Sequence, residues 1–201
     1  MDVAHVDAGL RSFVRTMPEE INRVLTDATS DLLFITEEGA ARNLAREGVP
    51  AEKIFFVGNI MIDTLIAYNR KAESSTIRAR LRLGSGSCRH PLVTLHRPSN
   101  VDDPMALKSS LGALVEVATR FQVVFPIRPC IRQRIEEARC EHYLRSDRLL
   151  TMEPLGYLDF LNLMSHTDYV ITDSGGIQEE TTVLGVPCLT ERPNTERPRH
   201  N

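Results

Sequence analysis

The feature that most constrains the fold is a regular alternation of short, apolar, β-rich runs with longer helical patterns. The β-rich runs lie at residues 3–6, 32–35, 54–57, 92–95, 123–125, 149–152, 169–172 and 188–190. The helical patterns cover residues 18–29, 37–47, 62–81, 104–120, 131–138, 157–166 and 177–184. Such alternation is typical of parallel strands joined by crossover helices, so the sequence predicts an α/β fold.

Helix and linker signals divide this pattern further. Thr16 and Glu19, with Pro18 between them, match a capping box, and Gly48 followed by Pro50 is typical of a helix end. Residues 84–90 are rich in Gly and Ser and form the best linker candidate. We therefore expect a partial Rossmann-like domain of three strands over 1–84 and a five-strand Rossmann-like domain over 85–201. The chain opens on a strand and stops without a closing helix, so we expect both domains to lack segments.

Composition excludes some classes of function. The chain has 201 residues, is 42% hydrophobic and 25% charged, and carries a net charge of −3, which gives no support to nucleic-acid or anionic-membrane binding. No apolar stretch approaches a bilayer span and the N-terminus does not resemble a signal peptide, so we expect a cytoplasmic protein. The four cysteines show no metal-ligand spacing. Unreactive thiols are favoured over zinc or disulfides, and we expect no metal and no cofactor.

The motif most informative about ligands follows the β-rich run at 169–172. Ser174, Gly175 and Gly176 form a small turn at the start of a helix, where backbone N–H groups can approach an anion. Glu180 lies one to two turns into that helix, where a carboxylate could hold sugar hydroxyls. The pattern indicates a nucleotide or a nucleotide sugar, although a Gly-rich turn that only begins a helix is the alternative.

Polar clusters also follow other predicted strands, and ligands of open α/β sheets bind beyond the carboxyl ends of the strands. The clusters begin at Asp7, His96, Pro126, Glu153 and Ser174. They predict one long cleft, with phosphate-compatible groups mostly in the C-terminal piece and carboxylates in the N-terminal piece. Structural interpretations stay open: Glu19 could only close the capping box, and His96 could be a satisfied structural histidine. Arg11 and Arg15 could be solvated surface charges, and Phe160 and Leu163 could be core.

Several longer motifs occur in a fixed order, at residues 5–12, 17–23, 57–59, 93–100, 173–180 and 194–198. Together they resemble the non-hydrolysing UDP-N-acetylglucosamine 2-epimerases over nearly the whole chain. The resemblance implies a glycosyltransferase-B-like architecture of two Rossmann-like domains with parallel sheets, and a homodimer. It also implies interconversion of UDP-N-acetylglucosamine and UDP-N-acetylmannosamine, by elimination of UDP to a glycal and its re-addition.

The resemblance also implies roles for individual residues. Catalytic positions are matched by Asp7, Glu19 and His96. UDP-sugar contacts are matched by Leu155, Phe160, Ser174, Gly175, Gly176, Glu180 and Arg197, with Leu155 and Phe160 beside the uracil. Further contacts to a second nucleotide sugar are expected from Arg97 and Arg128.

The chain departs from the family pattern in ways that keep other functions open. Asp7 stands where the family has Glu, and Arg128 stands where it usually has His. A nucleotide-contacting Arg and a catalytic Asp of the family have no counterpart in this sequence. A nucleotide-sugar glycosyltransferase and a non-catalytic UDP-binding protein are therefore the alternatives. The absence of G-x-G-x-x-G and P-loop motifs disfavours a dinucleotide dehydrogenase and a P-loop enzyme.

Overall fold

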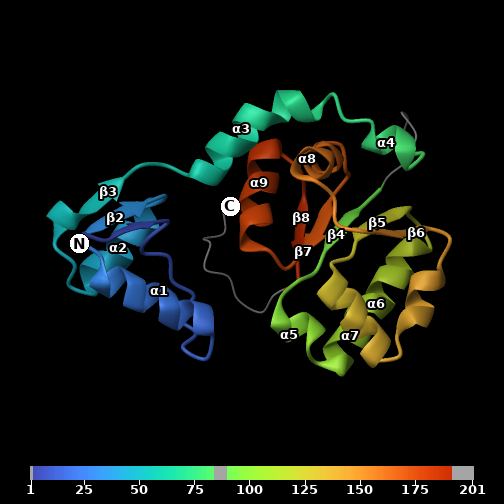
Figure 1. Cartoon of the computed structure of the whole chain (residues 1–201), viewed down its shortest axis with the longest axis horizontal. Coiled ribbons are helices and arrows are strands. Elements are labelled where there is room, and N and C mark those ends of the chain that lie inside the picture. The colour runs from blue at the N-terminus through green and yellow to red at the C-terminus, as the bar shows by residue number, and fades with distance from the viewer. Residues whose placement is uncertain (1, 84–89, 192–201) are drawn as a thin grey trace. The chain divides into compact units, whose positions relative to one another are not determined.

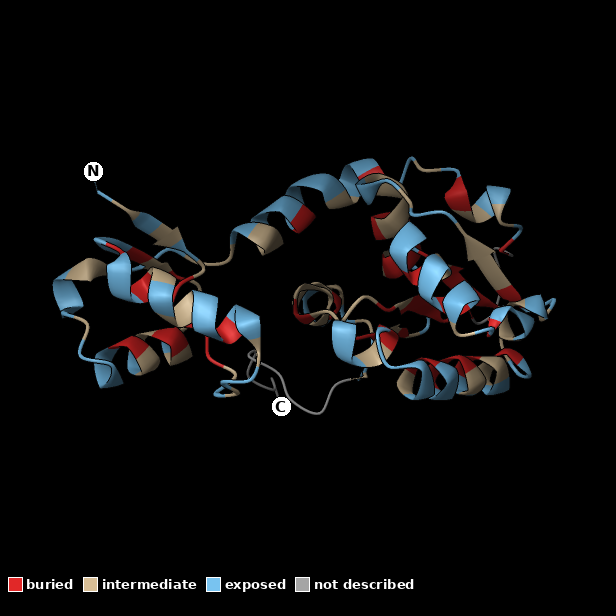
Figure 2. Cartoon of the chain, turned by 60° about the horizontal axis from the view of Figure 1, so that its bottom comes forward, coloured by how far each residue is buried: buried red, intermediate tan, exposed pale blue. Residues whose placement is uncertain are grey.

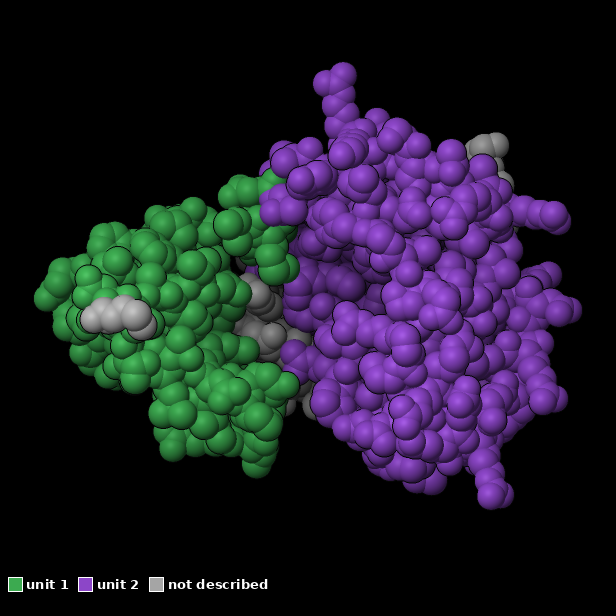
Figure 3. Space-filling model, viewed as in Figure 1, with its two compact units in different colours: residues 1–63, 192–201 green, residues 64–191 purple. Residues whose placement is uncertain are grey.

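The computed structural model describes residues 2–83 and 90–191 (Figure 1). The chain forms two compact units, which Figure 3 shows in different colours. Unit 1 contains the described residues up to Asp63, and unit 2 is Thr64–Glu191. Each unit is built around its own parallel sheet, so the predicted α/β class is confirmed.

The two sheets contain the strands that the sequence predicts. The sheet of unit 1 has the order β1-β2-β3, and that of unit 2 has the order β6-β5-β4-β7-β8. All neighbouring strands in these sheets are parallel. The strands are β1 (Ala4–Val6), β2 (Leu32–Ile35), β3 (Ile54–Phe56), β4 (Leu92–Thr94), β5 (Val123–Pro126), β6 (Leu149–Met152), β7 (Val170–Thr172) and β8 (Cys188–Thr190).

The helices follow the strands in alternation. They are α1 (Pro18–Thr29), α2 (Glu38–Arg46), α3 (Ile60–Ala72), α4 (Ile77–Arg80), α5 (Pro98–Val101), α6 (Pro104–Ala118), α7 (Pro129–Glu137), α8 (Tyr157–Ser165) and α9 (Gly175–Leu184). Short 3₁₀ turns lie at Ala51–Lys53 and Glu141–Arg145. The four-residue helix α5 was not predicted, because it is too short to show a helical period.

The single helix predicted over 62–81 is wrong, because α3 ends at Ala72 and α4 begins at Ile77. The hydroxyl of Ser75 accepts a hydrogen bond from the N–H of Ile77 at 3.1 Å and donates one to Asp159 at 2.5 Å. Serine hydroxyls that bond the backbone locally compete with the helical pattern, which explains the break.

The ends of the first two helices test the predicted caps. Gly48 has φ of +82° directly after α2, as expected for a glycine beyond a helix end. The predicted capping box is wrong: Met17 is the N-cap of α1, and no side chain caps that helix. Pro18 does occupy the first helical position, where its missing N–H is tolerated.

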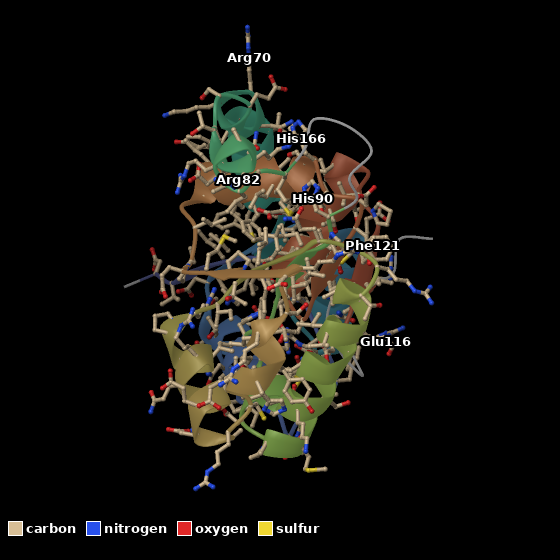
Figure 4. All side chains as sticks on the ribbon, turned by 90° about the vertical axis from the view of Figure 1, so that its right-hand side faces the viewer. Arg70, Arg82, His90, Glu116, Phe121 and His166 are labelled. Carbon is tan, nitrogen blue, oxygen red and sulfur yellow. The ribbon has the colours of Figure 1, made fainter. Side chains whose placement is uncertain are left out.

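Alternating strand residues build two cores in unit 2. Figure 2 colours the buried residues red. Val93 and Phe125 face a cluster formed with α6 and α7, whereas Leu92 and Val124 face a cluster that includes residues of α8 and α9. The second cluster also takes in Leu65, Ala72 and Ile77 of α3 and α4. The outer side of α3 carries Arg70, which points away from the ribbon (Figure 4).

The compact units divide after Asp63, whereas the sequence predicted a division after residue 84. The difference arises because the apolar face of α3 and α4 packs on unit 2 rather than on the sheet that precedes it. The predicted linker, residues 84–89, lies outside the described residues.

The strand order of unit 2 determines where a ligand can bind. Chain order reverses between β4 and β7, which lie side by side in the sheet. The 75 residues between the end of β4 and the start of β7 contain β5 and β6. In open α/β sheets, such a switch point leaves a crevice beyond the carboxyl ends of the strands. The segments that follow β4 and β7 therefore define the candidate site.

Candidate functional site

A pocket of about 350 Å³ opens beyond the carboxyl ends of the strands of unit 2. Its walls come from the segments after β4, β5, β6 and β7. The lining residues are Thr94, Leu95, His96, Pro126, Arg128, Pro154, Leu155, Tyr157, Phe160, Ser174 and Ile177. Four of the five predicted polar clusters thus meet in one pocket, and the fifth, at Asp7, belongs to unit 1.

The N-terminus of α9 supplies the anion-binding geometry that the sequence predicts. Ser174 is the N-cap, and its hydroxyl accepts from the N–H of Ile177 at 3.4 Å. Gly175 and Gly176 follow in the first turn, where an α-helix leaves N–H groups without an intrahelical acceptor. The positive end of the helix dipole adds to the attraction for an anion. This end of the pocket therefore suits a phosphate group.

Asp173 organises the switch point and was missed as a site residue. Its carboxylate is fully buried and accepts the N–H of His96 at 2.9 Å and the N–H of Arg97 at 2.8 Å. It also accepts the amide of Asn100 at 3.2 Å. The carboxylate therefore links the loop after β4 to the turn formed by Ser174, Gly175 and Gly176 after β7. The sequence signal was an acidic residue directly after a buried strand and before Ser174.

The same carboxylate holds the His96 ring. Nδ1 of His96 lies 2.6 Å from Oδ1 of Asp173, so Nε2 is the ring nitrogen that remains for a ligand in the pocket. Burial opposes ionisation of Asp173, but hydrogen bonds from the His96 ring and from the N–H groups of Arg97 and His96 outweigh it and lower the pKa of this carboxyl. His96 thus presents an oriented Nε2 at the pocket wall, which accepts a hydrogen bond when the ring is neutral and donates one when the ring is protonated.

The two arginines that the sequence singles out differ in their surroundings. Nε of Arg97 donates to the carbonyl oxygen of Asp173 at 2.9 Å, so this side chain braces the turn. Arg128 is exposed at the pocket and, among the described residues, has no carboxylate partner. Its charge is therefore available to an anion in the pocket.

One part of the pocket wall is apolar. Leu155 and Phe160 line it, and Ile177 of α9 contributes from the first turns of that helix. Glu180 lies one turn beyond Ile177 on α9 and is half-buried. Burial raises the pKa of Glu180, and burial also raises the pKa of Tyr157. A flat apolar wall next to a carboxylate can accept a base and a sugar.

Unit 1 holds the two predicted catalytic carboxylates. Asp7 follows β1 with φ of +66°, and its Oδ1 accepts the hydroxyl of Thr36 at 3.0 Å. Glu19 is exposed in the first turn of α1 and closes no capping box, so its structural interpretation is wrong. Glu20 is instead the buried neighbour, which accepts the N–H groups of Ser12 and Phe13, both at 2.9 Å.

A buried ionic network supports the Asp7 loop. Nε and Nη2 of Arg11 donate to the two carboxylate oxygens of Glu47, at 2.7 and 2.6 Å. Nη2 of Arg11 also lies 2.6 Å from Oδ2 of Asp27. Asp27 also accepts the N–H of Gly9 at 3.0 Å and contacts His5 at 2.5 Å. The interpretation of Arg11 as a solvated surface charge is therefore wrong, because its side chain is only 1% exposed.

Other predicted features are placed as follows. Arg197 and the motif at 194–198 lie outside the described residues. Leu163 is fully buried core, whereas Phe160 lines the pocket.

Within residues 2–83 and 90–191, no helix is long and apolar enough to cross a membrane, and no three His, Cys, Asp or Glu side chains are grouped as metal ligands. Cys130, Cys140 and Cys188 are free thiols.

Comparison with known proteins gives a consistent family. A family model described as UDP-N-acetylglucosamine 2-epimerase matches residues 1–200. The UDP-N-acetylglucosamine 2-epimerase of Methanocaldococcus jannaschii is 44% identical over 202 residues, which cover 98% of this chain and 55% of that protein. A Pseudomonas aeruginosa protein named UDP-2,3-diacetamido-2,3-dideoxy-D-glucuronate 2-epimerase is 40% identical, with coverage of 96% and 52%.

A solved structure agrees with the sequence relatives. The M. jannaschii UDP-GlcNAc 2-epimerase, crystallised in complex with UDP-GlcNAc and UDP, matches with a TM-score of 0.87 at 42% identity. The match covers 98% of this chain and 55% of that one. The predicted glycosyltransferase-B-like fold with parallel sheets is confirmed by this likeness. The chain spans about half the length of the curated relatives it matches.

Proposed function

Since the chain belongs to the UDP-N-acetylglucosamine 2-epimerase family, we propose that it binds UDP-N-acetylglucosamine and serves its interconversion with UDP-N-acetylmannosamine. The observation that carries the proposal is the pocket of unit 2, whose lining combines a helix N-terminus, an arginine without a carboxylate partner among the described residues, and apolar side chains. A diphosphate joined to an aromatic base and a sugar has groups that match the anion-binding and apolar parts of this lining.

We assign the parts of UDP from the family resemblance, which the chemistry of these residues supports. The diphosphate lies at Ser174, Gly175 and Gly176, with Arg128 as its counter-charge and Arg197 as a further contact. The uracil lies against Leu155 and Phe160. The ribose hydroxyls donate to Glu180, because an ionised carboxylate is a strong acceptor for two neighbouring hydroxyls.

The proposed reaction is an elimination followed by an addition. A carboxylate removes the proton from C2 of the sugar, the C1–O bond breaks, and the electron pair of the C2–H bond forms the C1=C2 double bond. UDP leaves with the electrons of the C1–O bond and adds back after a proton reaches the other face of C2. Asp7 and Glu19 are assigned to proton transfer, and His96 to stabilising the departing diphosphate, since such groups act in general acid–base catalysis.

Two measurements on the chain test the proposal. Calorimetry should detect UDP binding that Gly175→Val abolishes, because a valine side chain would fill the phosphate turn. Gly112→Val is the matched control, since Gly112 lies on α6 and a Cβ there meets only ordinary contact at 3.8 Å. Absence of binding by the unchanged chain at millimolar UDP overturns the assignment.

The second measurement follows the chemistry in heavy water by NMR. Deuterium incorporation at C2 of UDP-N-acetylglucosamine supports epimerisation, whereas UDP binding without exchange supports the non-catalytic alternative. Sugar transfer to an added acceptor would instead support a glycosyltransferase.

We also propose, from the family resemblance, a homodimer and, from the sequence signals, a cytoplasmic location. Sedimentation equilibrium of the purified protein tests the first, and cell fractionation tests the second.

A further inference from the structure

Two threonines meet at the switch point between β4 and β7. Thr94 and Thr172 are the last residues of these strands and are partners in the parallel register. Their side-chain oxygens lie 2.6 Å apart, so the two hydroxyls share one hydrogen bond. Thr172 is fully buried, whereas Thr94 is partly buried and lines the pocket. One member of the pair is thus closed off from solvent, and the other borders the pocket.

The pleat of the strands determines the face of the sheet on which both side chains lie. Leu92 and Val170, two residues before the threonines, belong to the core cluster that includes residues of α8 and α9. Side chains two apart on a strand project from the same face, so Thr94 and Thr172 also project on the side of α8 and α9. Ile177 of α9, which packs against that cluster, lines the pocket as well. The side chain of Thr94 therefore lies on the face of the sheet that the pocket adjoins.

The direction of the shared hydrogen bond follows from the available protons. The hydroxyl of Thr172 accepts the N–H of Ser174 at 3.0 Å, and a hydroxyl has one proton to donate. Among the described residues, Thr94 is the only other hydrogen-bond partner of the Thr172 hydroxyl. If Thr94 were the donor, the proton of the fully buried Thr172 would have no acceptor, which costs free energy. Thr172 is therefore the donor and Thr94 the acceptor.

The proton of the Thr94 hydroxyl is then left for the pocket. Within residues 2–83 and 90–191, the side chain of Thr94 makes no hydrogen bond other than the one with Thr172. The N–H of Ser174 is directed to Thr172, which leaves the N–H groups of Gly175 and Gly176 at the start of α9. The free proton and these N–H groups are all donors. A phosphate, whose ionised oxygens are acceptors, is the ligand that this set of donors favours.

We propose that Thr94 is a further substrate-binding residue, whose hydroxyl donates a hydrogen bond to the diphosphate of the nucleotide. The inference rests on the proposed function, which places the diphosphate at Ser174, Gly175 and Gly176. The buried Thr172 determines the direction of the shared bond, so the donor is ready before the nucleotide binds. Such preorganisation reduces the entropy that is lost on binding.

Calorimetry of the full chain with UDP tests the inference. Thr94→Val keeps the shape of the side chain and removes the hydroxyl, so it should weaken UDP binding about tenfold, the effect of one hydrogen bond to a charged group. Thr94→Ser is the matched control, because it keeps the hydroxyl, and its UDP affinity should stay within about twofold of the unchanged chain. Uridine, which has no phosphate, should bind equally to the unchanged chain and to Thr94→Val.

A second variant serves if valine prevents folding by leaving the proton of Thr172 without an acceptor. Thr94→Cys offers a sulfur that still accepts from Thr172, but its S–H is a weak donor. Because cysteine and serine differ in one atom, the comparison isolates the donated hydrogen bond. Thr94→Cys should bind UDP about fivefold less tightly than Thr94→Ser.

UDP affinities of Thr94→Val and Thr94→Cys equal to that of the unchanged chain would overturn the inference and leave the proposed function intact. An equal loss in Thr94→Ser would also overturn it, because the methyl group rather than the hydroxyl would then matter. A loss of uridine affinity as large as that of UDP would place the hydroxyl away from the diphosphate. Failure of the unchanged chain to bind UDP would instead refute the proposed function, and the inference with it.

Discussion

Replacement of Asp173, whose carboxylate is buried, should strongly destabilise unit 2. Asp173→Asn preserves size but removes the charge and one acceptor oxygen. The carboxylate accepts the backbone N–H groups of His96 and Arg97 and the amide of Asn100, and it pairs with the His96 ring. An asparagine can keep its oxygen at the Oδ2 position, where the three amide groups donate, and then turns its NH₂ group toward the His96 ring.

The magnitude follows from the loss of the charge. The backbone N–H groups of His96 and Arg97 and the amide of Asn100 all donate to Oδ2, a position that the asparagine oxygen can take. A hydrogen bond to a charged group contributes about 1.5–3 kcal/mol, and one to a neutral group about 0.5–1.5 kcal/mol. Over three such bonds, we expect a loss of about 3 kcal/mol in the free energy of unfolding.

Tyrosine fluorescence offers an assay specific to unit 2. The chain has four tyrosines and no tryptophan, and all four, Tyr68, Tyr143, Tyr157 and Tyr169, lie in unit 2. With a urea slope of about 2 kcal/mol/M, the expected loss lowers the midpoint by about 1.5 M. Asp103→Asn is the matched control. Asp103 caps α6 through the N–H of Met105 at 3.0 Å, and Asn is an equally good cap.

The pH dependence has a defined sign. The folded-state pKa of Asp173 is lowered: burial opposes ionisation, but the bonds from His96 and Arg97 outweigh it. Its stabilisation is therefore complete above the unfolded carboxyl pKa of about 3.9 and is lost as the pH falls through the folded pKa. The difference in the free energy of unfolding between the unchanged chain and Asp173→Asn should be constant near neutral pH and shrink in acid. Equal midpoints at pH 7 would refute the role given to this carboxylate.

Three further predictions concern other sites. Gly9→Ala should destabilise unit 1 by about 3 kcal/mol, because the new Cβ would lie 2.7 Å from the carbonyl oxygen of Ala40. Gly48 has a similar φ but open space around it, so Gly48→Ala should cost about 1 kcal/mol. Urea unfolding followed by circular dichroism measures both changes. Glu19→Gln should leave UDP affinity unchanged and slow deuterium exchange at C2 at least about 100-fold; unaltered exchange contradicts its assignment. Arg128→Ala should weaken UDP binding about tenfold and reduce its salt dependence, with uridine binding unaffected in calorimetry.

The order of strands and helices was predictable because its signals are local. Apolar runs of strand length and helical periods occur within a few residues of each other, and the structure places them within one or two residues of expectation over most of the chain. The break between α3 and α4 was missed because it depends on a bond from Ser75 to Asp159, which lies 84 residues away.

The residues that line the pocket were partly predictable, but the hydrogen bonds that hold them in place were not. The rule that ligands bind beyond strand ends placed His96, Arg128 and Ser174 together, since it needs only the strand assignments. The role of Asp173 depends on donors 77 and 76 residues away, and its place directly after a buried strand marks it only as a polar residue at the strand end. The burial of Arg11 likewise depends on Glu47, 36 residues away.

The loop between β1 and α1 has few backbone bonds of its own, and two carboxylates of α1, Asp27 and Glu20, hold it. The N–H groups of Ser12 and Phe13 donate to Glu20, which lies in the first turn of α1. In hydrogen exchange, these two loop amides should therefore be released only when the start of α1 opens, as if they were part of the helix. The loop that carries the motif at residues 5–12 thus takes its rate of local unfolding from α1 rather than from its own irregular backbone.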